Sequence, residues 1–214
     1  MAEEHPDPAA SYAALWDWRR QVADLYADLR GMADAKAAWR VWRARRDQLF
    51  AQHPQSPLDP ARRQRFEALD LFPYDPHFRF EVAVEGLEDR APVPVAAGAD
   101  GETVLLPFAR TRGLARDLGG ELVLYWIAGY GGGVFLPFRD ATSGATTYAG
   151  GRYLLDTIKG ADLGSGDGRV VLDFNFAYHP SCTYSHRWVC PLAPTANWLP
   201  VPVTAGERLE VAAS

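Results

Sequence analysis

The hydrophobic pattern of the chain changes near Phe78, and this change limits the fold more than any other feature of the sequence. Over residues 15–29, large apolar side chains recur every three or four positions, which is the spacing of one helix face. Over residues 78–85, apolar and charged side chains alternate, which is typical of a half-buried strand. The sequence therefore predicts an α+β fold in which N-terminal helices pack on an antiparallel β-sandwich or barrel.

Helix start signals occur in the first third of the chain. Asp7, Asp34 and Asp59 each stand where an N-cap is expected, and Asp7 and Asp59 are followed by a Pro that can begin a helix. The predicted helices run from Pro8 to before Gly31, from Asp34 to before Pro54, and from Pro60 through Phe66 to Leu69. We divide the chain into an N-terminal helical segment, residues 1–72, and a mainly-β domain, residues 73–214, and expect one compact unit.

Short strands separated by turns are expected over the remaining sequence. Glycine-rich stretches such as Gly119-Gly120 and Gly131 to Gly133 supply turns. The predicted strands span residues 78–85, 103–108, 121–128, 134–138, 147–155, 170–174, 199–203 and 208–211. Helices do not alternate with these strands, so a doubly wound nucleotide-binding fold is not expected. Residues 173–197 are predicted to form a long loop, braced by prolines, over one end of the sheet.

The charge of the chain narrows its expected partners. Its 214 residues include 22 Lys and Arg against 27 Asp and Glu, a formal net charge of −5. A net-acidic surface argues against general nucleic-acid binding, and we interpret the basic clusters Arg40 to Arg46 and Arg62 to Arg65 as solvated helix faces. No apolar run approaches the roughly 18 residues of a membrane helix. We expect a cytoplasmic protein that binds a small molecule and neither nucleic acid nor membrane; its oligomeric state is left open.

The segment from Asp173 to Leu199 gathers residues that can carry chemistry. His179, Cys182, His186 and Cys190 lie close together in it, and imidazole and thiolate groups are good zinc ligands. A small zinc-binding loop over residues 179–190 is therefore one hypothesis, with zinc as the cofactor; otherwise we expect none. Two alternatives stay open. The cysteines are packed thiols, or Cys182 and Cys190 form a disulfide that closes a nine-residue loop.

A second polar stretch, Arg139 to Arg152, is expected beside the first. Its arginines can present forked donors to a carboxylate or phosphate, and Asp173 with His179 can act as acid and base. The predicted ligand-binding residues are Arg139, Asp140, Thr147, Tyr148, Arg152, Asn175, Tyr178 and Asn197. The alternative is a buried network in which an arginine–aspartate pair holds two loops together without a ligand.

The function that these residues favour is a polar pocket for a small anionic molecule, with a hydrolase as the least specific enzyme class. The chain has no G-x-S-x-G elbow and no Walker loop. The alternative is a non-catalytic interaction or scaffold module whose polar motifs are structural. A large exposed apolar patch on the Trp-rich helices would favour this module, and a deep cleft lined by both polar stretches would favour the pocket.

Several motifs together resemble a known family. They are FRDATSGATTYAGGRYL from Phe138 to Leu154, DFNFAYHPSCTY from Asp173, CPLAP from Cys190, Asn197, and Ala205-Gly206-Glu207, preceded by Arg46-Asp47, Phe50, Ser56-Pro57-Leu58 and Phe66. From about Arg43 to Glu207 the chain thus resembles the bacterial and archaeal family called domain of unknown function 1684. The resemblance implies no established activity. His179 stands where this family usually has Asn in an AYNP motif.

Overall fold

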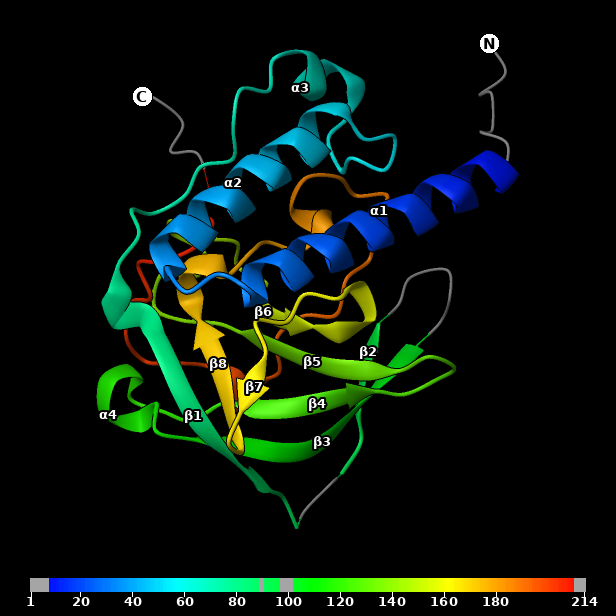
Figure 1. Cartoon of the computed structure of the whole chain (residues 1–214). Helices are drawn as coiled ribbons and strands as arrows, with labels where there is room; N and C mark the ends of the chain where they lie inside the picture. Colours follow the sequence, from blue (N-terminus) through cyan, green and yellow to red (C-terminus); the bar gives the residue numbers. More distant parts are fainter. Residues whose placement is uncertain (1–7, 89–90, 97–101, 210–214) are drawn as a thin grey trace.

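The computed structural model describes residues 8–88, 91–96 and 102–209, and over these residues the fold is α+β (Figure 1). Helices α1 (Pro8–Arg30) and α2 (Ala35–Gln52) are followed by the short helix α3 (Pro60–Gln64). The strands form one antiparallel sheet that curls into a half-barrel, and α1 and α2 lie across one side of it (Figure 1). The predicted fold class is confirmed, with a single curled sheet in place of two stacked ones.

The sheet has the strand order β6-β5-β4-β3-β1-β8-β7, and β2 pairs with β3. The strands are β1 (Arg79–Gly86), β2 (Val93–Ala96), β3 (Glu102–Arg112), β4 (Val123–Ile127), β5 (Gly133–Phe138), β6 (Arg152–Asp156), β7 (Ser165–Gly166) and β8 (Arg169–Asp173). The register shifts between Pro107 and Ala109 and between Leu136 and Pro137. Such irregularities bend strands and increase their twist, which helps the sheet to curl.

The chain after β8 runs back across the sheet without forming another strand, as predicted for residues 173–197. Its short 3-10 turns are η4 (Phe174–Phe176), η5 (Ser181–Thr183) and η6 (Thr195–Asn197). Other short helical pieces are η1 (Pro76–Phe78), α4 (Ala115–Leu118) and η3 (Thr157–Lys159). Isolated backbone bridges join Arg139 to Trp198 and Tyr153 to Tyr178. The two polar stretches therefore lie against each other.

The helix limits follow the capping residues seen in the sequence. Asp34 caps α2, because its Oδ1 accepts hydrogen bonds from Lys36 N at 2.9 Å and Ala37 N at 3.0 Å. Asp59 caps α3 in the same way, and α1 ends directly before Gly31. The predicted cap Asp7 lies outside the described residues. Helix α3 ends at Gln64, earlier than predicted, and Leu69 N instead donates to Asp47 Oδ1 of α2 at 2.8 Å.

Two apolar layers stabilise the sheet, one on each face. Tyr125 of β4 belongs to the layer shared with the helices, and its neighbour Leu124 belongs to the layer on the opposite face, as the alternation of a strand requires. Trp42 of α2 is fully buried in the first layer, and its Nε1 donates to Tyr26 OH of α1 at 3.1 Å. The helical segment and the sheet therefore share one core.

Three of the strand predictions differ from the structure, one at its start and two over all of their described residues. Strand β6 begins at Arg152 and not at residue 147, because residues 142–151 form turns in which Thr147 N donates to Thr142 O. Residues 199–203 and 208–209 are not strands, and residues 210 and 211 lie outside the described part of the chain. Strands β2 and β7 were not predicted. In the described ranges, no helix has both the length and the hydropathy needed to cross a membrane.

Candidate functional site

Arg152 and Asp140, predicted to bind a ligand, form a fully buried ion pair. Both side chains are 0% exposed, and Arg152 Nη2 lies 3.3 Å from Asp140 Oδ1. The guanidinium also donates to the backbone oxygens of Ala205, Val203 and Glu207. Asp140 Oδ2 accepts from Val203 N at 2.7 Å. The pair thus fastens the C-terminal segment to the sheet, and it corresponds to the structural alternative of an arginine–aspartate pair that holds loops together.

Thr147 and Asn197, also predicted to bind a ligand, are likewise bonded within the fold. The Oγ1 atoms of Thr147 and Thr142 are 2.9 Å apart in a buried contact. Asn197 exchanges hydrogen bonds with Val123 N and O, and its Nδ2 donates to Pro137 O at 2.7 Å. The amide of Asn197 is fully buried, and it joins η6 to the edges of β4 and β5. Both of its N–H donors are engaged within the fold, and its oxygen already accepts from Val123 N.

Asn175 and Arg139 hold neighbouring segments in the same manner. Asn175 Oδ1 accepts from Asp75 N at 2.9 Å, and its Nδ2 donates to Asp75 O at 2.8 Å. The guanidinium of Arg139 is partly buried and stacks on the ring of Trp198, 4.3 Å from its centroid. Tyr178 is buried beneath the guanidinium of Arg46, at 4.8 Å.

Glu207 is the centre of a second buried network. Its Oε1 accepts from Arg46 Nε at 2.8 Å and from Arg46 Nη2 at 2.5 Å. Its Oε2 accepts from His179 N at 2.7 Å and from Tyr184 OH at 3.1 Å. Gly206, directly before it, has φ +78°, and a Cβ there would lie 2.5 Å from Ala177 O, so only glycine fits. This network joins α2, the loop after β8 and the C-terminal segment.

The structure places the two predicted acid–base residues in separate surroundings. His179 Nε2 accepts a hydrogen bond from Tyr148 N at 3.2 Å, and its Nδ1 lies 3.8 Å from Glu207 Oε2. Burial, followed by the charges of Arg152 and Arg46, lowers the pKa of His179 to about 3, so the ring is neutral at pH 7.

Asp173 instead interacts with Asn175. Its Oδ1 accepts from Asn175 N at 2.9 Å and from Asn175 Nδ2 at 2.8 Å. Burial raises the pKa of Asp173 to about 6. Over the described residues, His179 and Asp173 form no ion pair with each other, and both are almost completely buried.

Cys182 and Cys190 are free thiols, each partly buried. The Cys182 thiol donates to Tyr148 OH at 3.8 Å. His179, Cys182, His186 and Cys190 do not form a group of potential metal ligands, and no such group of three or more occurs in the described ranges. His186 is exposed, whereas both ring nitrogens of His179 face protein atoms. The disulfide alternative is not realised in this structure.

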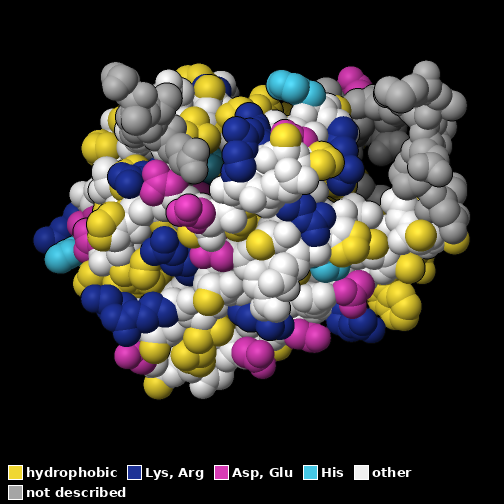
Figure 2. Space-filling model, turned by 90° about the horizontal axis from the view of Figure 1, so that it is seen from above, with side chains coloured by type: hydrophobic (Ala, Val, Ile, Leu, Met, Phe, Trp, Pro, Cys, Tyr) yellow, Lys and Arg dark blue, Asp and Glu magenta, His cyan; other side chains and the backbone are white. Residues whose placement is uncertain are grey.

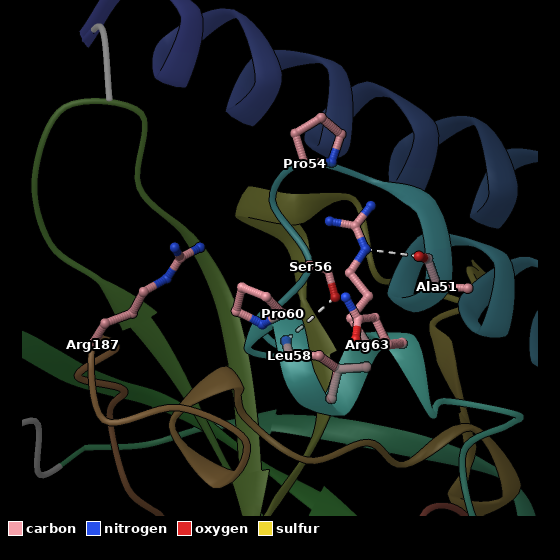
Figure 3. A pocket seen from close by; sticks show the side chains of 8 residues that line it. Ala51, Pro54, Ser56, Leu58, Pro60, Arg63 and Arg187 are labelled. Atoms are coloured by element: carbon pink, nitrogen blue, oxygen red, sulfur yellow. Dashed lines mark hydrogen bonds between the residues drawn. The ribbon is translucent and has the colours of Figure 1, made fainter. Parts of the chain in front are cut away.

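A groove of about 510 Å³ lies between the end of α2, α3 and the loop after η5 (Figure 3). It is lined by Ala51, Pro54, Ser56, Leu58, Pro60, Arg63, Gln64 and Arg187. A second groove of about 410 Å³ shares Pro54 and Arg187 and continues along the start of α1. Arg187 comes from the Asp173–Leu199 segment, but the residues predicted to bind a ligand line neither groove.

The guanidinium groups of Arg63 and Arg187 approach the larger groove from different segments (Figure 3). Arg63 Nε donates to Ala51 O at 2.7 Å, and its Nη2 donates to Gln52 O, so Arg63 also caps the C-terminus of α2. Arg187 is exposed and lies over the Trp188 ring at 4.7 Å. Neither arginine forms an ion pair with a carboxylate in the described part of the chain. Figure 2, viewed from the helical side, shows acidic and basic side chains interspersed.

Comparison with known proteins assigns the chain to a family. The family model described as "Protein of unknown function (DUF1684)" matches residues 64–208, which is more than half of the chain. The chain belongs to this family. The solution NMR structure of an uncharacterized protein from Haloarcula marismortui is 35% identical in sequence, with a TM-score of 0.56; the match covers 83% of this chain and 96% of that chain. No curated protein matches.

The DUF1684 match ends directly after Glu207, and it includes both polar stretches. Arg46, the partner of Glu207, lies before the matched range. The sequence analysis interpreted Arg40 to Arg46 as a solvated helix face, and this is wrong for Arg46, which is buried. Arg46 and Glu207 both belong to the motifs on which the family resemblance is based, and this membership was the sequence feature that could have identified them as important. Arg63 and Arg187 carried no such signal.

The helices also expose apolar side chains, as the scaffold alternative requires. Tyr12 is 72% exposed and Trp16 is 67% exposed, one turn apart on α1. The guanidinium of Arg20 lies over the Trp16 ring at 5.2 Å. The scaffold alternative stays a prediction.

Proposed function

We propose that the protein binds a small anionic molecule, with a carboxylate or phosphate group, in the groove between α2, α3 and the loop after η5. The observation that carries this proposal is that one groove of about 510 Å³ is lined by two arginines, Arg63 and Arg187, neither of which has a carboxylate partner among the described residues. Guanidinium groups bind planar anions through paired donors. The apolar lining, Pro54, Leu58 and Pro60, suits a ligand with an apolar body.

The site lies elsewhere than the sequence predicts, because the predicted residues are used by the fold. Arg152 and Glu207 donate and accept within buried networks, and these networks hold the C-terminal segment and the loop after β8 in position. The same loop carries Arg187 at its exposed end. The buried side chains of the two polar stretches thus act as a framework that presents Arg187, and in this proposal Arg187 is the residue of these stretches that contacts the ligand.

The proposal is for binding without catalysis. Among the described residues that line the larger groove there is no carboxylate, imidazole or thiol. The one hydroxyl, that of Ser56, donates to Phe50 O at 2.6 Å and accepts from Leu58 N at 3.3 Å, so it is engaged in the turn after α2. A hydrolase would need an activated nucleophile or water and a base within hydrogen-bond reach of it. The cytoplasmic location expected from the sequence suits capture of a small metabolite.

A titration with two probes tests the proposal. Benzoate offers a carboxylate on an apolar body, and inorganic phosphate offers the anion alone; backbone amide shifts of residues 51–64 and 185–189 report binding. We expect benzoate to shift these residues, and Arg187→Gln to weaken binding about ten- to hundredfold, the worth of one charged hydrogen-bonding partner. Arg116→Gln is the matched control, since Arg116 is an exposed arginine of α4, distant from α3 (Figure 1).

Two results would contradict the proposal. One is the absence of shifts around the groove with either probe. The other is equal benzoate affinity in Arg187→Gln and Arg116→Gln. Native mass spectrometry of untagged protein would add the identity of any anion that remains bound after purification.

A further inference from the structure

The smaller groove, of about 410 Å³, adjoins the larger one, because Pro54 and Arg187 line both. It lies between the start of α1, the turn after α2 and the loop after η5. Its other lining residues are Ala10, Ser11, Ala14, Gln55 and Trp188. Its volume lies within the roughly 300–1,000 Å³ of small-molecule sites. The two grooves therefore form one continuous depression, and Arg187 belongs to both parts of it.

The walls of the smaller groove are fastened to each other. Gln55 Nε2 donates to Ser11 O at 3.0 Å and lies 3.4 Å from Ser11 Oγ. Directly before this turn, His53 Nδ1 accepts from Gln55 N at 3.0 Å, and His53 Nε2 lies 3.2 Å from Asp17 Oδ2 of α1. These bonds join α1 to the turn after α2. The groove is therefore formed in the absence of a ligand, which lowers the entropic cost of binding.

The smaller groove offers a mainly apolar surface. Four of its seven lining residues are Ala, Pro or Trp, and of these Ala14 and Trp188 are half-buried. Its two uncharged polar side chains, Ser11 and Gln55, are in contact with each other. Among the described residues that line it, Arg187 is the one charged residue. A second anionic group would therefore find no other cation in this groove, whereas a methylene chain would be removed from water.

The guanidinium of Arg187 is available to an anion where the grooves adjoin. It lies over the Trp188 ring, 4.7 Å from the centroid. A guanidinium that stacks on an aromatic face keeps the N–H donors in its own plane, and these match the geometry of a carboxylate. In the described part of the chain, Arg187 donates through its backbone N, to Ser185 Oγ at 3.4 Å, and its side chain donates to no protein acceptor.

We propose that the ligand is a medium-chain monocarboxylate, with its carboxylate at Arg187 and its alkyl chain in the smaller groove against Ala14 and Trp188. This inference rests on the proposed function, and it extends that function by naming the ligand class and the surface that selects it. The larger groove provides for the anion, and the smaller groove favours a ligand with one charged end over a dicarboxylate or an inorganic anion.

A series of straight-chain carboxylates tests the inference on the full-length protein. Butyrate, hexanoate and octanoate have the same charge and differ in chain length, and suberate has the carbon count of octanoate with a second carboxylate. A half-buried methylene contributes roughly twofold in affinity, so octanoate should bind about tenfold more tightly than butyrate, and suberate no more tightly than butyrate. Octanoate should also shift the backbone amides of residues 10–14, which butyrate should leave unchanged.

Two substitutions on α1 form a matched pair. Ala14→Gln places a neutral polar side chain in the smaller groove, and Ala13→Gln places the same side chain at an exposed position that lines neither groove. Ala14→Gln should reduce the gain from butyrate to octanoate to less than about threefold and leave butyrate affinity unchanged. Ala13→Gln should keep the full gain. Circular dichroism verifies that both variants are folded.

The outcomes separate this inference from the function on which it rests. Equal affinities of butyrate and octanoate, with amide shifts in residues 51–64 and 185–189, would overturn the inference and leave the anion groove in place. Suberate that binds as tightly as octanoate, or a full gain in Ala14→Gln, would overturn it as well. If none of the carboxylates shifted residues of either groove, the proposed function would fail together with the inference.

Discussion

Replacing Glu207 by Gln is the most direct test of the buried networks that hold the fold. The side chain of Glu207 is 1% exposed, and that of its partner Arg46 is 11% exposed. Gln has nearly the same shape but no charge, and its amide nitrogen cannot accept a hydrogen bond. The variant leaves the Arg46 charge buried without a counter-ion, and its amide NH2, which cannot accept, faces either Arg46 or the two donors His179 N and Tyr184 OH.

The size of the effect follows from the burial. Removing one partner of a buried ion pair costs about 3–5 kcal/mol, because the other charge is left without compensation. For a domain of about 200 residues, each kcal/mol lowers the midpoint of thermal unfolding by roughly 2–4 °C, so we expect a decrease of roughly 6–20 °C. Urea denaturation at pH 7 should show the same loss in the free energy of unfolding.

The matched control is Glu85→Gln. Glu85 pairs with Arg112 at 2.7 Å, but the two side chains are 58% and 53% exposed. Exposed pairs contribute about 0–1 kcal/mol, so this variant should unfold close to the wild type. Adding Arg46→Met to Glu207→Gln removes the unpaired charge, and the double variant should recover at least about 1 kcal/mol of the loss. Equal stability of the two Glu→Gln variants would refute the reasoning.

Three further predictions concern single buried groups, each checked by urea unfolding. Asn197→Ala leaves Val123 and Pro137 backbone groups unpaired and should cost about 2–4 kcal/mol. Because the pKa of Asp173 is raised to about 6, the folded state holds its proton more tightly than the unfolded chain does. The free energy of unfolding should therefore fall by up to roughly 3 kcal/mol as the pH rises from about 4 to about 6, and Asp173→Asn should remove this slope. Because the pKa of His179 is lowered to about 3, the unfolded chain gains the proton first, and stability should fall as the pH drops from about 6.5 to about 3; an acid limb that persists unchanged in His179→Asn would contradict this.

Local features of the fold were predictable because their causes lie within a few residues. Asp34 and Asp59 cap helices through backbone N–H groups two or three residues away, and Gly31 ends α1. The alternation from Phe78 onward identified β1, and the turn signals between short segments identified most of the other strands. The strand predicted from residue 147 failed because turn bonds inside residues 142–151 compete with the sheet, and hydrophobic alternation does not show them.

The sequence by itself determined that polar and titratable groups concentrate in two stretches, Arg139 to Arg152 and Asp173 to Leu199. Only the tertiary structure decided which arginine is structural and which is free. Arg152 finds backbone acceptors 51 to 55 residues away, and Arg46 finds Glu207 161 residues away, so both are buried and compensated. Arg187 lies in the same stretch as His179 but ends in a groove formed by the N-terminal helices. Residue type gives the chemistry of a side chain, and long-range packing decides whether that chemistry is used inside the fold or offered to a ligand.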